Sequence, residues 1–343
     1  HTHTHTHTHT HNTHTHTQHT HTHTIICPRH TTPHRSRPDS YSYLVNGRPL
    51  NGAFTYLLTD NPTDRGTSYV DAKMKDIEAA LKGLDANYNS KFGPYPVIFF
   101  NVLSESRRDQ LQNLTKAVIH WVDISRHYPP TLPDLPVFKD QTPTSFTLGE
   151  GCASVVWWLE YLHMIRFRLV SQWHEEIFTH FDYIAQMDID AAIESARVDV
   201  FSQIDANNKT FGYYSCSPDL VTCIRGLYEE TLHYTQENRI DWKDKATAIM
   251  PNAYWAPFFV FRTEWFRTNP AFLHYIDFID STGNIYKRRW GEQTVLVLAL
   301  SLSLPYEQIF FTGGLRLMHY LQPWPPARKC TGTKAAPSCC DIS

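Results

Sequence analysis

The sequence lacks several features that would assign it to a common functional class. It has no run of about 18 apolar residues, so the chain as printed shows no pattern of a membrane-spanning helix. The formal net charge is only −3, which argues against a protein that binds nucleic acid by neutralising phosphates. The sequence contains no phosphate-binding glycine loop, and its seven cysteines include no Cys-x-x-Cys pair, which argues against a structural zinc site.

The cysteines and two asparagines bear on the cellular compartment. The cysteine spacing is compatible with disulfides, and Cys216 with Cys223 is one candidate pair. Asn113-Leu-Thr and Asn208-Lys-Thr are sequons for N-glycosylation. Both observations allow a secretory compartment without requiring one.

Residues 1–24 differ in composition from the rest of the chain. They read HTHTHTHTHTHNTHTHTQHTHTHT, with no apolar residue and with 11 of the 21 histidines, so the histidine count says nothing about the folded domain. A translated CA dinucleotide repeat gives this alternation, and metal capture by clustered imidazoles is the functional alternative. We expect a linker over residues 25–50, a single domain over 51–325 and a C-terminal tail over 326–343.

The first half of the expected domain alternates strand and helix patterns. Hydrophobic residues make up 41% of the 343 residues and aromatic residues 13%, which is enough to bury a substantial core. Apolar runs predict strands at 53–59 and 95–102, with an amphipathic helix at 70–88 between them. This βαβ unit implies parallel strands joined by a right-handed crossover. A helix at 106–119 and a short strand at 120–125 continue the alternation.

The second half continues the α/β pattern after a loop rich in Pro and Thr at residues 128–150. The expected elements are one or two helices over 153–178, a strand over 181–190, a strand over 210–217, a helix that begins at Pro218, and a last α/β section over 254–314.

The strand over 181–190 ends on two carboxylates, Asp188 and Asp190. Residues i and i+2 of a strand point to the same face, so the two like charges would repel unless a cation lay between them. Ligands of open α/β sheets bind at the carboxyl ends of the strands. Many nucleotide-sugar glycosyltransferases hold Mg²⁺ or Mn²⁺ on such an Asp-x-Asp, where the ion offsets the charge of a diphosphate leaving group. The alternative interpretation is a solvated turn after a strand.

Six segments in the same order extend this pattern across the domain. They are YLHMIRF (161–167), YIAQMDID (183–190), FGYYSCSPDL (211–220), WAPFFVFRTEWFR (255–267), IYKRRWGEQTVLVLALSLSLPYEQIFF (285–311) and GGLRLMHYLQPWP (313–325). Together they resemble the fungal α-1,2-mannosyltransferase family, glycosyltransferase family 15, over about residues 50–325.

The resemblance implies a fold, a reaction and a compartment. The expected fold is an α/β, GT-A type nucleotide-sugar-binding fold with a mixed, mainly parallel sheet flanked by helices. The expected reaction is transfer of mannose from GDP-mannose to an oligosaccharide or glycoprotein acceptor, with retention of configuration and with Mn²⁺ or Mg²⁺. Family members are usually type II membrane proteins of the Golgi, so the resemblance implies the Golgi lumen, although the anchor is not present in this chain.

The resemblance also implies roles for individual residues. The expected metal ligands are Asp188, Asp190 and His319, and a histidine nitrogen beside carboxylates suits Mn²⁺ better than Mg²⁺. The expected donor contacts are Tyr161, Arg166, Asp188 and Tyr213, and the candidate catalytic acids are Glu292, Glu229 and Glu230. A structural ion pair is the alternative role for Arg166, and either Arg166 or Arg288 could assist the leaving group.

Three departures from the family pattern put the transfer reaction in question. Gln186 replaces the glutamate two residues before the motif aspartate, and Phe259 replaces the glutamate often considered as the nucleophile. Ala253 and Tyr254 stand where the family has a histidine before Trp255. Two alternatives therefore stay open: an inactive relative that binds a glycan or a partner, and an active transferase that uses a UDP-sugar.

Overall fold

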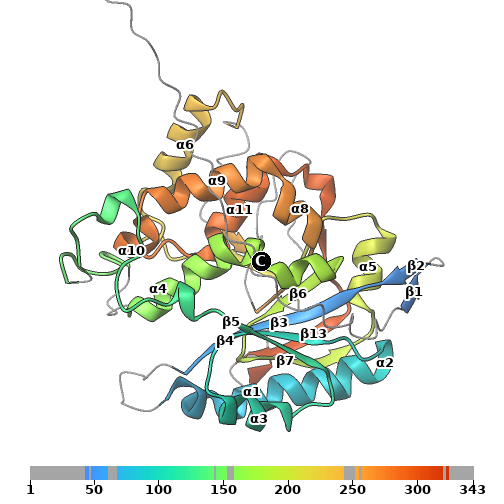
Figure 1. The fold of residues 1–343 in the computed structure, drawn as a ribbon. Coiled ribbons are helices and arrows are strands. Elements are labelled where there is room, and N and C mark those ends of the chain that lie inside the picture. Colours follow the sequence, from blue (N-terminus) through green and yellow to red (C-terminus); the bar gives the residue numbers. More distant parts are fainter. Residues whose placement is uncertain are drawn as a thin grey trace, which may run out of the picture. The chain divides into compact units, whose positions relative to one another are not determined.

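The computed structural model describes residues 43–45, 48–60, 68–142, 144–152, 158–242, 252–254, 257–319 and 322–323. The His-Thr repeat of residues 1–24, most of the segment expected to be a linker and the tail over 326–343 lie outside these ranges. Ser40–Ser343 forms one compact unit. Within it, a central seven-stranded sheet carries helices on both faces (Figure 1).

The central sheet has the strand order β12-β8-β11-β6-β3-β4-β5. Its strands are β3 (Gly52–Thr59), β4 (Val97–Val102), β5 (Ile119–Asp123), β6 (Tyr183–Met187), β8 (Phe211–Tyr213), β11 (Phe258–Arg262) and β12 (Ile309–Phe311). Only β11 runs against its neighbours β6 and β8, while the other pairs in this sheet are parallel. The mixed, mainly parallel sheet expected from the sequence is confirmed.

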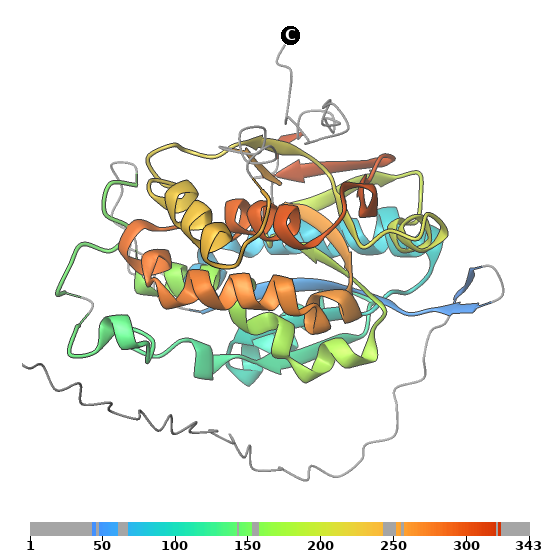
Figure 2. The ribbon, with the colours of Figure 1, turned by 90° about the horizontal axis from the view of Figure 1, so that it is seen from above.

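Helices cover both faces of this sheet, as Figures 1 and 2 show. On one face lie α4 (Leu159–Arg166), α6 (Leu227–Glu237), α8 (Thr263–Thr268), α9 (Pro270–Ser281), α10 (Asn284–Arg288) and α11 (Glu292–Ser303). On the other lie α1 (Tyr69–Leu84), α2 (Ser90–Phe92) and α3 (Glu105–Gln112), and α5 (Val200–Ala206) packs into the same core. Each face has its own hydrophobic core, so the sheet is buried on both sides, as its nearly continuous apolar strands require.

Shorter turns of helix connect these elements. The π-helical turns are η1 (Asp85–Asn89) and η4 (Phe167–Ser171), and the 3₁₀ turns are η2 (Ser125–His127), η3 (Pro136–Phe138), η5 (Gln172–His174), η6 (Glu176–His180) and η7 (Tyr306–Gln308). None of the helices within the described ranges is long and apolar enough to cross a membrane.

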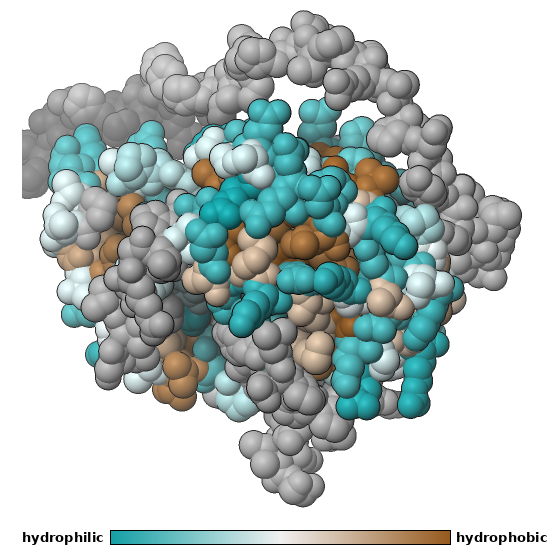
Figure 3. Space-filling model, turned by 90° about the horizontal axis from the view of Figure 1, so that it is seen from below, coloured by the Kyte–Doolittle hydropathy of each residue, from teal (hydrophilic) through white to brown (hydrophobic). Residues whose placement is uncertain are grey.

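Helix α1 shows how the sequence pattern becomes packing. Ser68 caps the helix by accepting a hydrogen bond from the Asp71 amide, and Ile77, Leu81 and Leu84 are buried at the spacing of one helix face. Gly83 allows the helix to approach strand β7 (Ala191–Ala196), because a Cβ there would lie 2.8 Å from the Ile193 backbone oxygen of that strand. The molecular face seen from below is mostly hydrophilic, with apolar residues visible near its centre (Figure 3).

A second, three-stranded sheet has the order β14-β13-β7. Its strands are β7 (Ala191–Ala196), β13 (Leu315–His319) and β14 (Gln322–Pro323), and all its pairs are antiparallel. Two further antiparallel pairs lie within the described ranges: β1 (Tyr43–Val45) with β2 (Arg48–Leu50), and β9 (Cys216–Pro218) with β10 (Asn252–Tyr254). The β1–β2 pair lies inside the segment that we expected to be a linker.

Several expected boundaries were wrong. The helix expected from Pro218 begins only at Leu227, because residues 219–226 form a turn region in which the Asp219 carboxylate accepts a hydrogen bond from Thr294. The helix expected over 106–119 ends at Gln112. The candidate pair of Cys216 with Cys223 is also wrong, since Cys223 is bonded to Cys152.

Candidate metal and donor site

Asp188 and Asp190 lie in a tight turn between β6 and β7. Strand β6 ends at Met187, so the aspartates follow the strand rather than belonging to it. The Asp188 amide still donates to the Pro257 carbonyl beside β11, and the Ala191 amide donates to the Asp188 carbonyl over 3.0 Å. These two bonds hold both carboxylates at the carboxyl end of a central strand, which is the position expected for ligand binding.

His319 reaches the aspartates through the second sheet. It is the last residue of β13, and the antiparallel register places it opposite Ala191, the residue after Asp190. His319 is 8% exposed, and its Nε2 lies 3.3 Å from Asp190 Oδ1. Pairing of β13 with β7 therefore brings together residues that are far apart in the sequence.

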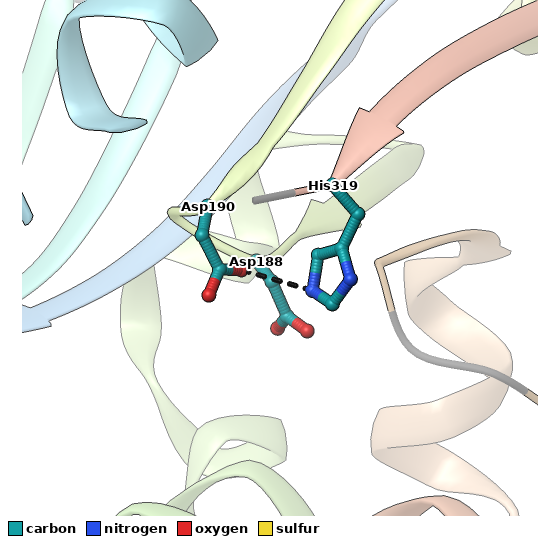
Figure 4. A group of neighbouring side chains, drawn as sticks. All are labelled: Asp188, Asp190 and His319. Atoms are coloured by element: carbon teal, nitrogen blue, oxygen red, sulfur yellow. Dashed lines mark ion pairs between the residues drawn. The ribbon is translucent and has the colours of Figure 1, made fainter. Parts of the chain in front are cut away.

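Asp188, Asp190 and His319 form a group that could hold one metal ion. One ligand atom from each residue lies within 4.8 Å of those from the other two. Figure 4 shows the two carboxylates and the imidazole gathered between the turn after β6 and the end of β13. Two carboxylates with one imidazole fit Mn²⁺, which accepts mixed oxygen and nitrogen ligands.

Two basic side chains pair with the aspartates. Arg168 Nη2 lies 3.4 Å from Asp188 Oδ1, and Lys73 Nζ from α1 lies 3.4 Å from Asp190 Oδ2. Arg168 comes from η4 on one face of the central sheet, and Lys73 comes from α1 on the other. Each aspartate is thus held by a cation from a different layer of the fold.

Burial raises the pKa of Asp188 to about 7. The charge of Arg168 opposes this rise, while the negative charges of Asp190 and Glu292 add to it. A carboxyl group with such a pKa is only partly ionised near neutral pH. A cation bound beside Asp188 would favour the ionised form.

Asp190 behaves in the opposite way although it is also partly buried. Burial acts to raise its pKa, but the hydrogen bond and charge of His319, together with Lys73, lower the pKa below its ordinary value. The turn therefore presents one carboxylate that is ionised at neutral pH and one that titrates there.

A second polar group lies beside the triad around Arg289. Its Nη2 donates a hydrogen bond of 2.8 Å to the Tyr161 hydroxyl, and its Nη1 lies 4.0 Å from Asp219 Oδ1. Burial raises the pKa of Tyr161, and although Arg289 opposes this rise, the charges of Glu292 and Asp188 add to it. The same charge of Glu292 raises the pKa of Asp188. Tyr161 and Glu292 are therefore both electrostatically coupled to the metal triad.

Two of the other residues expected to contact the donor, Arg166 and Tyr213, make contacts within the protein. Arg166 Nε and Nη2 donate to the two carboxylate oxygens of Asp280 at 2.8 and 2.7 Å, so the alternative role of Arg166, a structural ion pair, is present. Tyr213 on β8 is 3% exposed and stacks on Tyr254, with ring centroids 4.8 Å apart. A donor contact by Arg166 or Tyr213 stays a prediction.

Two of the candidate catalytic acids lie in the first turn of α6. Glu229 is exposed and Glu230 is half-buried. Across the described ranges, no hydrogen bond or ion pair joins either of them to the triad. Glu292 begins α11 and is the candidate acid whose charge acts on Asp188.

Sequence reasoning missed Arg168, Arg289 and Lys73 as neighbours of the site. It selected Arg166 and Arg288, which lie two residues and one residue away. A π-helical turn follows α4 and changes which side chains face the sheet, and Arg289 adopts a left-handed φ of 59° at the end of α10. No sequence signal predicts either feature, although Lys73 lies on the predicted helix.

Two of the positions expected to depart from the family pattern lie side by side in the central sheet. Gln186 on β6 pairs in register with Phe259 on β11, and Phe259 pairs with Tyr213 on β8. Directly paired residues of antiparallel strands place their side chains on the same face of the sheet. The structure therefore has an amide opposite a phenyl ring two residues before Asp188.

The chain resembles known proteins in sequence. Residues 67–335 match the family described as glycolipid 2-alpha-mannosyltransferase. The probable mannosyltransferase KTR3 of Saccharomyces cerevisiae is 22% identical over 310 residues, which cover 83% of this chain and 74% of that protein. The glycolipid 2-alpha-mannosyltransferase of S. cerevisiae is 22% identical over 277 residues, which cover 75% of this chain and 59% of that protein.

Solved structures show the same fold. Core-mannan synthase A (CmsA/Ktr4) from Aspergillus fumigatus, crystallised in an Mn/GDP form, matches with a TM-score of 0.65 and 20% identity over 86% of this chain and 82% of that one. The mannosyltransferase Ktr4p of S. cerevisiae matches with a TM-score of 0.65 and 17% identity over 81% of this chain and 72% of that one. The GT-A type fold expected from the sequence is confirmed. Because the family match covers more than half of the chain, the protein belongs to the glycolipid 2-alpha-mannosyltransferase family.

Proposed function

We propose that this protein is a metal-dependent glycosyltransferase that moves mannose from GDP-mannose to a hydroxyl group of an oligosaccharide or glycoprotein, with retention of configuration. The observation that carries the proposal is the triad of Asp188, Asp190 and His319, gathered at the carboxyl end of β6 in a member of this family. The structural relative from A. fumigatus was crystallised with Mn and GDP, which supports the same metal and nucleotide here.

The residues of the triad would hold the cation, and their surroundings would position the donor. A bound divalent ion would offset the negative charge that develops on the leaving diphosphate. Asp188, Asp190 and His319 would supply the protein ligands. Lys73, which pairs with Asp190, would become available to phosphate oxygens once a cation takes over that role.

The transfer needs no carboxylate at position 259. The bond between the anomeric carbon and the diphosphate oxygen breaks, and the acceptor oxygen bonds to the same face of that carbon. The proton of the acceptor hydroxyl passes to the leaving phosphate oxygen, so the nucleoside diphosphate is both leaving group and base. Proximity and electrostatic stabilisation then account for the rate. Of the three candidate acids, we place Glu292 nearest the reaction, because its charge acts on Asp188.

We place the reaction in the lumen of the Golgi. Family membership supports this location, and the Cys152–Cys223 disulfide is typical of proteins that fold in an oxidising compartment. Fluorescence microscopy of the tagged protein with Golgi and cytosolic markers tests the location. Co-localisation with the cytosolic marker would contradict it.

A second candidate function is a binding protein that keeps the fold without turnover. Phe259 favours it, because an acidic side chain considered as nucleophile in the family is absent there. A thermal-shift screen with and without Mn²⁺ separates the candidates, since a ligand that binds the folded state raises the melting temperature. The proposed function predicts a Mn²⁺-dependent shift with GDP-mannose that exceeds the shifts with UDP-glucose and UDP-galactose. A shift with a UDP-sugar alone would identify a different donor, and no shift with any of them would leave the binding protein.

A further inference from the structure

The side chain of Gln186 is buried without hydrogen bonds. It is 2% exposed, and neither its amide nitrogen nor its amide oxygen has a partner among the residues that the structure describes. Buried amide groups are nearly always hydrogen-bonded, because an unpaired one costs about 1–3 kcal/mol. A chain that keeps a glutamine here, rather than an apolar residue, indicates a partner that arrives from outside the protein.

Gln186 lies at the carboxyl end of β6, just before the turn that carries the two aspartates. It is the penultimate residue of β6, and its register partners are Thr55 on β3 and Phe259 on β11. The Asp188 amide continues the pairing with the chain before β11, so the period of two places the side chains of Gln186 and Asp188 on one face. The Gln186 amide therefore lies on the same face as the Asp188 carboxylate, two residues before it in the chain.

Two more polar side chains have buried atoms without partners in the described part of the chain, and one of them, Arg168, contacts Asp188. Arg168 is 6% exposed, and its Nη2 contacts Asp188 Oδ1 at 3.4 Å and the Met187 carbonyl at 3.5 Å, while its Nε has no partner within the described ranges. The buried Tyr128 hydroxyl also has no partner there, and the charge of Arg168 acts on it. We call Tyr128, Arg168 and Gln186 the buried polar cluster.

The chemistry of the cluster selects a neutral ligand rich in hydroxyl groups. An amide offers one acceptor and two donors, a phenol offers one of each, and the Arg168 Nε offers a donor. The positive charge of Arg168 is already balanced by Asp188, so the cluster provides no excess charge for another phosphate. Sugar hydroxyls both donate and accept. In a nucleotide sugar, the hexose is joined directly to the phosphate that the metal triad would hold, so it would lie within reach.

We propose that the Gln186 amide is a specificity-determining contact to the hydroxyls of the donor hexose, with Arg168 and Tyr128 as neighbouring contacts. The inference rests on the proposed function, because it takes the metal triad as the site of the diphosphate. It goes further in assigning the recognition of the sugar, as distinct from the nucleotide, to a residue that differs from the family pattern.

The test compares the affinity for the nucleotide with the affinity for the nucleotide sugar in one variant. Gln186→Met removes the amide while keeping an unbranched side chain of similar length. Isothermal titration calorimetry of the full chain at fixed Mn²⁺ gives the Kd for GDP and for GDP-mannose. We expect the Kd for GDP to be unchanged and the Kd for GDP-mannose to rise about tenfold, which corresponds to the loss of one hydrogen bond. Without ligand, the melting temperature should stay the same or rise, because an unpaired buried amide is removed.

Gln203→Met is the matched control. The Gln203 Oε1 is also buried without a partner in the described part of the chain, but Gln203 lies on α5, which packs into the core on the opposite face of the sheet. This variant should leave both affinities unchanged. The His-Thr repeat is present in every protein compared, so any metal that it binds cancels in the comparison.

Three results would overturn the inference alone. They are an unchanged Kd for GDP-mannose in Gln186→Met, an equal weakening of GDP and GDP-mannose, and a lower melting temperature without ligand, which would reveal a structural hydrogen bond. If the wild-type protein bound neither GDP nor GDP-mannose, the proposed function would fall and the inference with it. The two kinds of failure are therefore distinguishable.

Discussion

Asp188 is the residue on which the metal site depends most. Burial raises its pKa to about 7, and the neighbouring charges of Asp190 and Glu292 add to that rise. Because the pKa of Asp188 in the folded protein lies above the ordinary value, folding without metal favours the protonated form of its carboxyl group. Its contribution to stability is complete at low pH, below the pKa of an unfolded aspartate, and is lost as the pH rises through about 7.

Metal affinity should follow the opposite course with pH. A cation binds the ionised carboxylate, so the affinity for Mn²⁺ should rise about tenfold between about pH 6 and pH 8. A chain that begins at Ser40 should be used for the titration, because the histidines of the repeat titrate in the same range. In Asp188→Asn, the affinity should be weaker and this rise should disappear. The same rise in that variant would show that another group controls the affinity.

Arg168 and Arg289 are neighbours of the site that the sequence does not predict. The Asp-x-Asp pair and the motif with His319 were identified from the sequence, and the structure brings these three residues together. The basic residues expected at the site, Arg166 and Arg288, are not the ones found there, because that expectation assumed a regular helical backbone at both positions. A side chain two positions further round a π-helical turn, or one in a left-handed conformation, points in a direction that residue type does not reveal.

The strands of the central sheet were the elements most readily predicted. The strands expected at 53–59, 95–102 and 181–190 correspond to β3, β4 and β6, although β6 ends at Met187, because strands buried on both faces have little choice of composition. The pairing of β7 with β13 was not predicted. It joins segments about 120 residues apart in sequence, and local patterns contain no information on such pairing. That pairing is what brings His319 to Asp190.

His163 links α4 to α10 and to the loop after η2. Its Nε2 lies 2.9 Å from the Pro129 carbonyl, which can only accept, so Nδ1 accepts a hydrogen bond of 2.7 Å from the Tyr286 hydroxyl. Tyr286→Phe would leave that buried nitrogen unpaired and should lower the free energy of unfolding by about 1–3 kcal/mol. Urea denaturation followed by circular dichroism measures the change.

Tyr275→Phe is a suitable comparison for that variant. The Thr231 hydroxyl keeps a partner when the Tyr275 hydroxyl is lost, because it still donates to the Leu227 carbonyl, whereas His163 Nδ1 would lose its partner in Tyr286→Phe. The destabilisation should be smaller than in Tyr286→Phe. Equal effects in the two variants would contradict the account of the His163 hydrogen bonds.

The Cys152–Cys223 disulfide fixes the loop that leads into α6. It closes a segment with a sequence separation of 71 residues, and the loop-closure relation for that length predicts a stabilisation of about 4 kcal/mol. Replacing both cysteines with serine should lower the free energy of unfolding by up to that amount. Denaturation of the wild-type protein with and without reductant provides the comparison. No difference between the double variant and the wild type would mean that the bridge does not constrain the unfolded chain.

Two hydrophobic cores, one on each face of the central sheet, account for the stability of Ser40–Ser343 as one unit. The His-Thr repeat contains no apolar residue that could join either core. A chain that begins at Ser40 should therefore have the same melting temperature as the full chain and the same affinity for GDP-mannose. Differential scanning calorimetry and titration test both expectations. A lower melting temperature would show that residues 1–39 support the fold.

The transfer reaction is the central claim, and turnover of GDP-mannose measures it most directly. Release of GDP and formation of mannosylated product should be followed with and without Mn²⁺, for the wild-type protein and for Asp188→Ala/Asp190→Ala, with α-mannosides as acceptors. The account predicts Mn²⁺-dependent turnover by the wild-type protein and none by the folded double variant. Turnover that persists in that variant would contradict the assigned metal site, and absence of turnover in the wild type with every acceptor and nucleotide sugar would contradict the enzyme itself.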